Sequence, residues 1–389
     1  MKRCVGRYLW LAPGLTLGLI LSSAAVAEVR VGIDLSVTGP AAAIGMASRS
    51  AIQLWPKEIA GQKITYVYLD DASDPGNAVR NVRKLIGEER VDLLIGPTIA
   101  PNALAVLPVI AENQTPMMTL AASAAIVEPP AGPRYWAFKM PQNDTHMATV
   151  LTQHMADHGI KNVAFIGFAD AYGEGWWKEF SRLADMRHLR IVANERYART
   201  DTSVTGQVLK IMAAHPDAVL IAGAGTPAVL PQKTLKEKGY RGQIYQTHGI
   251  ATPEFLKLGG ADVEGTLFPT GPAVVADQLP KDHPVRNTAL SFQHIYSAAY
   301  GQVAPTQFAA DAWAAYLLLA NALPGALKAA QPGTREFRAA LRDQLEQTRN
   351  LTTPQGIINM SARDHVGLDQ RSRVMGKIQN GRFTYAGDK

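Results

Sequence analysis

Strand-like and helix-like segments alternate regularly from residue 29 onward, and this alternation limits the fold more than any other feature of the sequence. Short apolar runs are typical of buried strands, and apolar residues spaced three or four apart are typical of helices. Because strand–helix–strand units of this length form parallel strands joined by right-handed crossovers, we expect a doubly wound α/β sheet. The first predicted strands are 29–35, 64–69, 91–95 and 116–119, with helices at 77–88 and 101–113.

The alternation starts again near residue 144, which predicts a second α/β lobe. Ligands of open α/β sheets bind beyond the carboxyl ends of the strands, so we expect a cleft between the lobes. The second set comprises helices 145–158, 173–188, 204–214 and 227–238 and strands 163–167, 189–193, 218–222 and 244–246. Helical stretches at 284–300, 306–323 and 334–347 follow, then strands 373–378 and 383–385. The loops expected to face the cleft are 36–45, 96–101, 119–124, 168–173, 223–226 and 247–250.

The first 27 residues have the three parts of a secretory signal peptide. A basic start precedes a largely apolar run at 8–21, and small residues then precede Glu28. We therefore expect cleavage before Glu28 and export; the alternative is an uncleaved membrane anchor. The residues that define the basic start and the cleavage site are Lys2, Arg3, Arg7 and Ala25-Val26-Ala27.

Charge and cysteine content exclude several classes of function. The formal net charge is +6, and removal of the three basic residues of the signal segment would lower it to +3. Nucleic-acid binders usually concentrate more positive charge on one face, so we expect no nucleic-acid partner. The one cysteine, Cys4, lies in the segment expected to be removed, which argues against a disulfide, a cysteine-ligated zinc site and a thiol nucleophile.

Several isolated motifs have a structural interpretation and a functional alternative. The G-x-G-x-x-A pattern at 223–228 lacks the acid that a dinucleotide site needs about 20 residues later, so we interpret it as a tight loop. His154 and His158 are spaced for a metal, but no third ligand is evident. The acids at 70, 71 and 74 suit a strand end and a helix cap better than a cation site. We therefore predict no catalytic residue, no metal and no cofactor, and expect that the protein is not an enzyme.

A series of short motifs in a fixed order identifies a family resemblance. Taken together, they resemble the periplasmic substrate-binding proteins of branched-chain amino acid ABC transporters, which are leucine/isoleucine/valine-binding-protein-like and have the type I periplasmic binding fold. The resemblance covers essentially the whole chain after the signal segment. The motifs are Leu35-Ser36-Val37-Thr38-Gly39-Pro40 with Gly45, Asp70-Asp71 with Asp74-Pro75, Gly96-Pro97, Asp170-Ala171-Tyr172-Gly173 and Gly367-Leu368-Asp369.

The resemblance implies two Rossmann-like lobes joined by three crossover segments. Lobe one would comprise 28–141 and 270–365, and lobe two 142–269 and 366–389. The family closes on a small ligand and delivers it to an ABC permease of the inner membrane, so the resemblance implies a monomer in the periplasm without covalent chemistry. A sensory protein that docks on a membrane receptor is one alternative, and an exported enzyme on the same lobes is another.

The resemblance also places the ligand contacts. Where the family has a serine this chain has Ala100, and where it has an acid for the ligand ammonium this chain has His248. Both departures favour a carboxylate without an amine, held in part by a protonated His248; space at Gly225 would suit an aromatic acid. The alternative is an amino acid whose amine pairs with an acid elsewhere in the cleft. The predicted ligand-binding residues are Ile44, Ala100, Ala121, Ser123, Tyr172, Gly225 and His248.

Overall fold

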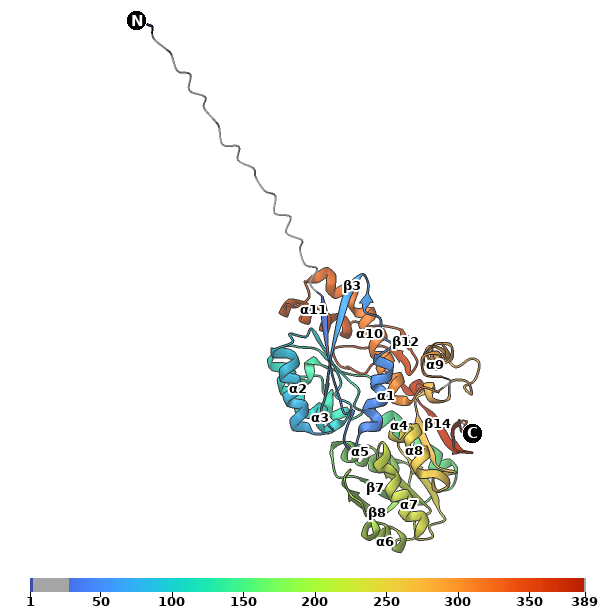
Figure 1. The fold of residues 1–389 in the computed structure, drawn as a ribbon. Helices are drawn as coiled ribbons and strands as arrows, with labels where there is room; N and C mark the ends of the chain where they lie inside the picture. The colour runs from blue at the N-terminus through green and yellow to red at the C-terminus, as the bar shows by residue number, and fades with distance from the viewer. Residues whose placement is uncertain (3–27, 302, 388–389) are drawn as a thin grey trace.

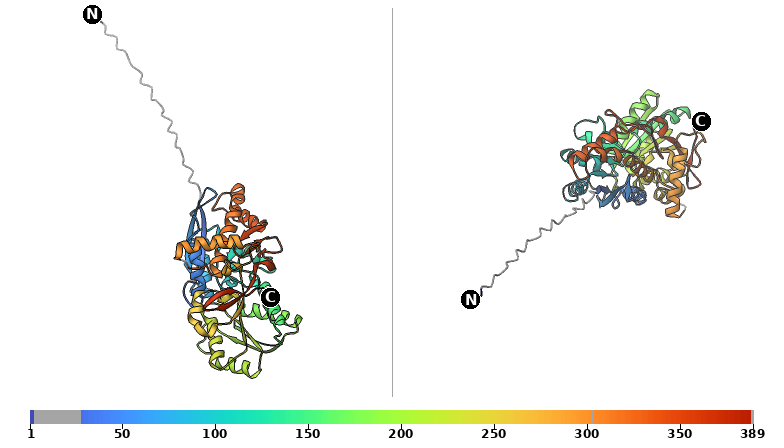
Figure 2. Two further views of the ribbon diagram at one scale, coloured as in Figure 1. Left: turned by 90° about the vertical axis from the view of Figure 1, so that its right-hand side faces the viewer. Right: turned by 90° about the horizontal axis from the view of Figure 1, so that it is seen from above.

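Two β-sheets, one in each half of the molecule, organise the chain (Figure 1). The computed structural model describes residues 1–2, 28–301 and 303–387, so the predicted signal segment lies almost wholly outside the described residues. Figure 1 and the left view of Figure 2 show the halves stacked end to end, with the blue and orange parts of the chain in one half and the green and yellow parts in the other. The predicted two-lobed α/β fold is confirmed.

The first sheet has the strand order β2-β3-β1-β4-β5-β6. Its strands pair in parallel except β2, which is antiparallel to β3. The order reverses at β1, which lies between β3 and β4, so the loops after β1 and β4 form a switch point. The strands are β1 (Val29–Leu35), β2 (Glu58–Ile59), β3 (Gln62–Asp70), β4 (Leu93–Ile95), β5 (Met117–Thr119) and β6 (Ala137–Lys139).

Helices cover both faces of this sheet. Figure 1 shows α2 and α3 together on one side and α1 and α10 on the other. Asp74 caps α2 by accepting from the Asn77 N–H at 2.7 Å, and Pro75 follows at the first helical position. The helices of this half are α1 (Ala42–Ile52), α2 (Pro75–Gly87), α3 (Ala100–Glu112), α9 (Arg286–Tyr300), α10 (Gln307–Ala329) and α11 (Arg335–Glu346), with the hairpin β12 (Leu351–Thr353) and β13 (Gly356–Ile358).

The second sheet has the order β15-β14-β11-β10-β9-β7-β8, with its switch point at β7. Strands β8 to β11 run parallel to β7, and β14 and β15 are antiparallel additions from the C-terminal tail. Its strands are β7 (Asn162–Phe168), β8 (Arg190–Tyr197), β9 (Ala218–Ala222), β10 (Gln243–Gln246), β11 (Leu267–Thr270), β14 (Val374–Gln379) and β15 (Arg382–Tyr385). Its helices are α4 (Asp144–Asp157), α5 (Ala171–Met186), α6 (Thr205–Ala213), α7 (Val229–Glu237) and α8 (Pro253–Gly259).

The chain passes between the two halves three times: between β6 and α4, after β11, and between β13 and β14. After β11 it returns to the first half, where the Tyr296 hydroxyl of α9 lies 2.7 Å from the Ser50 hydroxyl of α1. The exact residues at which the lobes exchange, 141/142, 269/270 and 365/366, stay a prediction.

The sequence patterns missed several elements. No helix was expected at α1 or α8, and no strand at β2, β6, β11, β12 or β13. In α1, Gly45 is needed because a Cβ there would lie 2.1 Å from the Ser36 carbonyl oxygen. Within β11, Pro269 lies opposite Met375 of β14 although proline is uncommon inside sheets. Close packing against neighbours, which local patterns do not reveal, forms these elements.

Candidate functional site

The carboxyl ends of both sheets face one cavity, as the switch-point rule predicts. About 370 Å³ of space inside it is free of atoms, part of which opens to solvent. One side is lined by residues of the first half and of the passage between β6 and α4: Ile44, Thr98, Ile99, Ala100, Leu120, Ala122, Pro141, Phe308 and Asp311. Residues of the second half line the other: Tyr172, Arg199, Ala224, His248 and Gly249.

The first-half wall is mostly apolar, and its loops are tied together behind the surface. The Thr98 hydroxyl accepts a hydrogen bond of 3.1 Å from the Ser36 N–H, which joins the loop after β4 to the loop after β1. Gly96 has φ +94°, and a Cβ there would lie 2.0 Å from the Asp34 carbonyl oxygen. Only glycine permits this approach of the two strands. The loop therefore presents Ile99 and Ala100 to the cavity in a fixed position.

The second-half wall is held by a hydrogen-bonded tyrosine. The Tyr172 hydroxyl lies 2.8 Å from the Thr247 hydroxyl, which in turn donates to the Gly223 carbonyl at 2.7 Å. These bonds connect the loops after β7, β9 and β10. His248 follows directly, with its ring centroid 5.8 Å from that of Trp176. Trp176 is completely buried and packs beside this ring.

Four of the seven predicted ligand-binding residues line the cavity: Ile44, Ala100, Tyr172 and His248. Ala121, Ser123 and Gly225 lie next to lining residues but are not on the surface of the cavity. A Cβ at Gly175 of α5 would lie 3.6 Å from the Ser123 hydroxyl, so this hydroxyl is directed toward that helix.

Gly225 does not line the cavity, so the space expected there for an aromatic ring is not part of it. A Cβ at Gly225 would lie 3.6 Å from the Ile44 side chain of the opposite half, which is an ordinary van der Waals contact. Gly225 itself has φ +63° and precedes Pro227, so the loop needs glycine for its backbone. This agrees with the interpretation of 223–228 as a tight loop.

Arg199 is a lining residue that the sequence analysis missed. Its Nε donates to Asp170 Oδ2 at 2.6 Å, and its guanidinium lies 4.1 Å from the centroid of the Phe168 ring. Asp170 is itself fixed because it caps α5 by accepting from the Tyr172 and Gly173 N–H groups. The Nη1 atom of Arg199 is buried and has no hydrogen-bond partner among the described residues. A buried, unpaired donor with a positive charge is suited to a carboxylate.

Asp311 is the second lining residue that was missed. It comes from α10 and is 1% exposed. Its Oδ1 accepts from Gln355 Nε2 at 2.6 Å, whereas Oδ2 is buried without a partner in the described part of the chain. Burial raises the pKa of the Asp311 carboxyl to about 7, and the bonds from Gln355 and Gln307 and the charge of Lys139 oppose that rise. The cavity therefore has an acid that changes charge near neutral pH.

His248 is buried and its Nδ1 has no partner among the described groups. Burial lowers the pKa of His248 to about 3, and the positive charge of Lys139 adds to the shift. The expectation of a protonated ring is therefore wrong for the ligand-free cavity: the imidazole is neutral at neutral pH. It can still give one hydrogen bond, but the positive charge for a ligand carboxylate has to come from Arg199.

Lys139, at the end of β6, does not reach the cavity. Its ammonium is buried and donates at 3.0 Å to each of the Ala122, Pro141 and Gln142 carbonyl oxygens. Burial lowers the pKa of Lys139, while the nearby Asp144 opposes that shift. This lysine fixes the backbone at the start of the passage from β6 to α4, which places Pro141 and Ala122 on the cavity wall.

The alternative motifs form structural contacts. His154 and His158 stack with ring centroids 3.9 Å apart, and His154 Nδ1 lies 3.0 Å from the Tyr245 hydroxyl. Asp70 accepts from the Val37 and Thr38 N–H groups, which closes the loop after β1. Within the described residues, no group of three or more His, Cys, Asp or Glu side chains could hold a metal ion. No helix in the described part of the chain is long and apolar enough to cross a membrane.

Comparisons of the sequence and of the fold with known proteins all find ligand-binding proteins. A family model described as "Periplasmic binding protein" matches residues 28–381. An extracellular ligand-binding receptor from Rhodopseudomonas palustris HaA2 is 48% identical in sequence, with a TM-score of 0.89 over 92% of this chain and 99% of that one. Leu/Ile/Val-binding protein homolog 3 of Brucella melitensis is 26% identical over 278 residues, which are 67% of this chain and 72% of the relative.

A more distant structure with the same fold contains a bound aromatic acid. It is a solute binding protein of an ABC transporter from Rhodopseudomonas palustris BisB5 in complex with 3,4-dihydroxy benzoic acid. Its sequence identity to this chain is 19%, and its TM-score is 0.76 over 92% of this chain and 95% of the other. At that identity the similarity shows the fold alone.

Proposed function

The chain belongs to the periplasmic binding protein family, and we propose that it is the periplasmic solute-binding component of an ABC importer that captures a small aromatic carboxylate. The family consists of solute-binding proteins that act with ABC permeases and are not enzymes. The observation that carries the proposal for the ligand is a pair of buried, partnerless groups on opposite walls of the cavity: Nη1 of Arg199 and Oδ2 of Asp311.

The charged end of the ligand is assigned to the second lobe. Arg199 Nη1 would donate a charge-assisted hydrogen bond to a carboxylate, and such bonds are the strongest that side chains form. His248, which is neutral in the ligand-free cavity, would add a second hydrogen bond from the same wall. The bond from Arg199 Nε to Asp170 keeps the guanidinium in place before the ligand arrives, which lowers the cost of ordering it.

The other end of the ligand is assigned to Asp311 of the first lobe. Its free Oδ2 would accept a hydrogen bond from a donor on the ligand, such as a phenolic hydroxyl. Because the pKa of Asp311 is already raised to about 7, this carboxyl tolerates a neutral partner better than an ordinary aspartate does. The walls between the two ends are apolar, with Leu120 and Phe308 among them, and suit the body of an aromatic ring.

An α-amino acid is the competing ligand class. The relative from Brucella melitensis is named for leucine, isoleucine and valine, whereas a structure of the same fold holds 3,4-dihydroxy benzoic acid. The fold thus accommodates both classes. Asp311 would pair with an ammonium group as well, but an amino acid carries its ammonium next to its carboxylate. Arg199 and Asp311 belong to different lobes, an arrangement that suits polar groups at the two ends of a ligand.

Calorimetric titration with benzoate, 4-hydroxybenzoate, leucine and isoleucine tests the proposal. We expect both aromatic acids to bind and 4-hydroxybenzoate to bind more tightly, because it alone carries a donor for Asp311. At about 100 times the dissociation constant, a bound acid should raise the free energy of unfolding by about 2.7 kcal/mol, which a thermal-shift assay detects. Binding of leucine or isoleucine without binding of either aromatic acid would refute the proposed ligand class.

We propose that the protein reaches the periplasm through cleavage after Ala27. The support is the signal-like segment at residues 1–27 and the family to which the chain belongs. Intact-mass analysis of protein recovered from the periplasmic fraction should give the mass of a chain that begins at Glu28. A full-length mass in that fraction, or a mass increased by a lipid, would contradict this proposal.

A further inference from the structure

Asp311 belongs to a cluster of four buried polar side chains. The other three are Gln307, Gln355 and Gln142. None is more than 1% exposed. Asp311 Oδ1 accepts from Gln355 Nε2 at 2.6 Å and from Gln307 Nε2 at 3.4 Å. Gln307 Nε2 also lies 2.9 Å from Gln142 Oε1. We call these four residues the glutamine cluster.

The glutamine cluster contacts all three passages between the lobes. Gln142 lies in the first passage, between β6 and α4. Gln307 Oε1 accepts from the Gly271 N–H at 2.7 Å, in the second passage after β11. Gln142 Nε2 donates to the Ser372 carbonyl at 2.8 Å, in the third passage before β14. Through Gln307 and Gln142, the cavity residue Asp311 is thus linked by a chain of hydrogen bonds to each of the three passages.

These bonds use one oxygen of Asp311 and leave the other free. A carboxyl held by two amide donors on Oδ1 keeps a fixed orientation, with Oδ2 directed away from the donors. In a buried network each bond strengthens its neighbours, and an unsatisfied member is costly. The amides of Gln307 and Gln355 therefore decide which way Oδ2 points, although neither residue lines the cavity.

We infer that Gln307 and Gln355 are positioning residues that aim Asp311 at a hydrogen-bond donor of the ligand and so set the preference for ligands that carry one. This inference rests on the proposed function, because it assumes a carboxylate ligand in this cavity. It adds two residues outside the cavity to the determinants of specificity.

The test compares two acids that differ by one hydroxyl group, 4-hydroxybenzoate and benzoate, in the parent and in Gln355→Met. Methionine has a similar length but no amide. The parent should bind 4-hydroxybenzoate about tenfold more tightly than benzoate. In Gln355→Met that ratio should fall to about one to two, while the affinity for benzoate changes less than about threefold. Gln307→Met should lower the ratio in the same direction.

Gln232→Met is the matched control. Gln232 is completely buried in the second lobe, where its Nε2 donates to Thr266 Oγ1 at 2.6 Å and to the Asp262 carbonyl at 2.9 Å. Gln232→Met should lower the melting temperature as much as Gln355→Met does. The ratio of the affinities for 4-hydroxybenzoate and benzoate should stay at the parent value. If Gln355→Met does not fold, Gln355→Asn replaces it, because the shorter amide cannot reach Asp311.

The affinity ratio and the melting temperature together distinguish a positioning role of the glutamine cluster from a purely structural one. An unchanged ratio in Gln355→Met with a lowered melting temperature would show that the glutamine cluster only stabilises the fold, which overturns the inference. Equal affinity of the parent for the two acids would also overturn it, while the carboxylate function would stand. Failure of the parent to bind either acid would refute the proposed ligand itself. A ratio lost in Gln355→Met and kept in Gln232→Met would support the inference.

Discussion

Arg199 and Asp311 show how single residues define this cavity. Asp311 is buried and the Arg199 side chain is 12% exposed, and each has one buried polar atom without a partner among the described residues. A second polar atom of each is held by a neighbour at 2.6 Å: Arg199 Nε by Asp170, and Asp311 Oδ1 by Gln355. The free atoms are thus presented in fixed positions, which is the condition for selective binding at low entropic cost.

Arg199→Met should abolish most of the affinity for carboxylates. Loss of a hydrogen bond to a charged group typically costs about 1.5–3 kcal/mol, so we expect binding of 4-hydroxybenzoate to weaken about 10- to 100-fold in calorimetry. Arg196→Met is the control: Arg196 pairs with Glu174 at 2.6 Å and does not line the cavity. Equal affinities of Arg199→Met and the parent would remove Arg199 from the site.

Asp311→Asn should change the pH dependence of stability. The pKa of Asp311 is raised from 3.8 to about 7, so between these values the folded state binds more protons than the unfolded state. The free energy of unfolding of the parent therefore falls as the pH rises through this range. Above about pH 7 the carboxyl is ionised in both states, and the whole loss of stability persists. From pH 5 to pH 8, the free energy of unfolding of Asp311→Asn should gain about 2–3 kcal/mol relative to the parent.

Urea denaturation at the two pH values measures this change. Gln307, Gln355 and Lys139 are the groups that act on the Asp311 carboxyl, and they are the same in both proteins. A difference between Asp311→Asn and the parent that stays constant from pH 5 to pH 8 would mean that Asp311 is ionised throughout.

The sequence predicted only part of the site at this scale. Tyr172 and His248 follow strands in motifs that the family resemblance could place. Arg199 follows β8 in a loop without any motif, so nothing in the local sequence distinguishes it. Asp311 did leave a signal: it is a lone acid in a helix that is apolar on nearly all sides. Such a helix is buried, and a charge within it has to serve a contact or a ligand.

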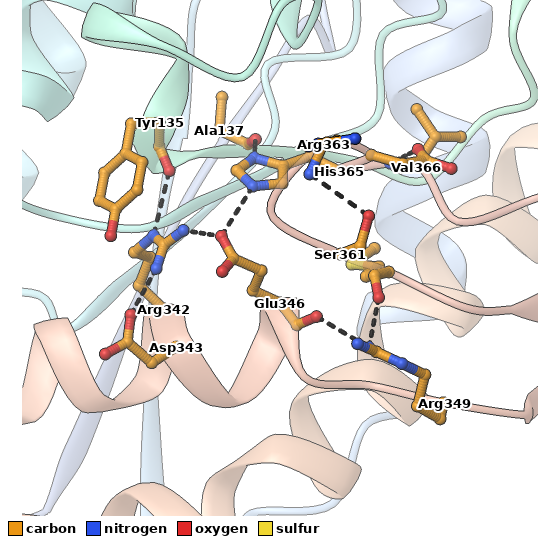
Figure 3. A network of polar contacts seen from close by, with 12 residues as sticks. Tyr135, Ala137, Arg342, Asp343, Glu346, Arg349, Ser361, Arg363, His365 and Val366 are labelled. Atoms are coloured by element: carbon orange, nitrogen blue, oxygen red, sulfur yellow. Dashed lines mark hydrogen bonds and ion pairs between the residues drawn. The ribbon is translucent and has the colours of Figure 1, made fainter.

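At the scale of elements, a second polar network fastens α11 to the first sheet. Figure 3 shows Arg342 and Glu346 of α11 and His365 directed toward one another. Arg342 Nε donates to the Tyr135 carbonyl at 3.2 Å, and its guanidinium lies 3.5 Å from the centroid of the Tyr135 ring. His365 Nε2 lies 3.1 Å from Glu346 Oε2, and its Nδ1 lies 2.8 Å from the Ala137 carbonyl of β6. None of these residues lines the cavity.

Arg342→Met should therefore lower stability without changing ligand affinity. The guanidinium is 2% exposed and pairs with Glu346 and Asp343. The two carboxylates are partly exposed, at 54% for Asp343 and 19% for Glu346, so the loss of these charged hydrogen bonds should cost about 1.5–3 kcal/mol. Thermal unfolding should show the loss, whereas Arg83→Met, at an exposed position of α2, should have almost no effect. A weakened affinity for 4-hydroxybenzoate would contradict the independence of this network from the cavity.

Elements with strong periodicity were predicted well, and the reason for the failures is physical. The long amphipathic helices and the apolar strands β1, β7 and β9 lie where their patterns indicated. Helix α1, with small residues and a glycine, lacks a clear polar face, and it forms because it packs between the loop after β1 and α10. Strands β6, β12 and β13 have three residues each, too few for alternation to be read.

At the scale of the whole molecule, the two lobes meet at a cavity whose walls come from both. Ile44 of one lobe approaches Gly225 of the other, so contacts between the lobes form next to the cavity. A ligand that touches Arg199 and Asp311 at once would add bonds that exist only when the lobes are together. Such a ligand shifts the population toward the closed conformation.

Small-angle scattering should detect this closure. We expect the radius of gyration to fall when the parent is saturated with 4-hydroxybenzoate, because the acid binds the closed conformation more tightly. Arg199→Met at the same acid concentration should keep the value of the ligand-free protein, provided that binding is weakened as predicted. An unchanged radius of gyration for the saturated parent would count against capture by closure.

A crystal structure of the protein with 4-hydroxybenzoate bound would show directly which residues hold the ligand. The carboxylate should lie within hydrogen-bond distance of Arg199 Nη1 and the hydroxyl within hydrogen-bond distance of Asp311 Oδ2, with the ring between the lobes. An acid bound outside this cavity, or one bound inside it without contact to either residue, would contradict the claim that the ligand is held between Arg199 and Asp311.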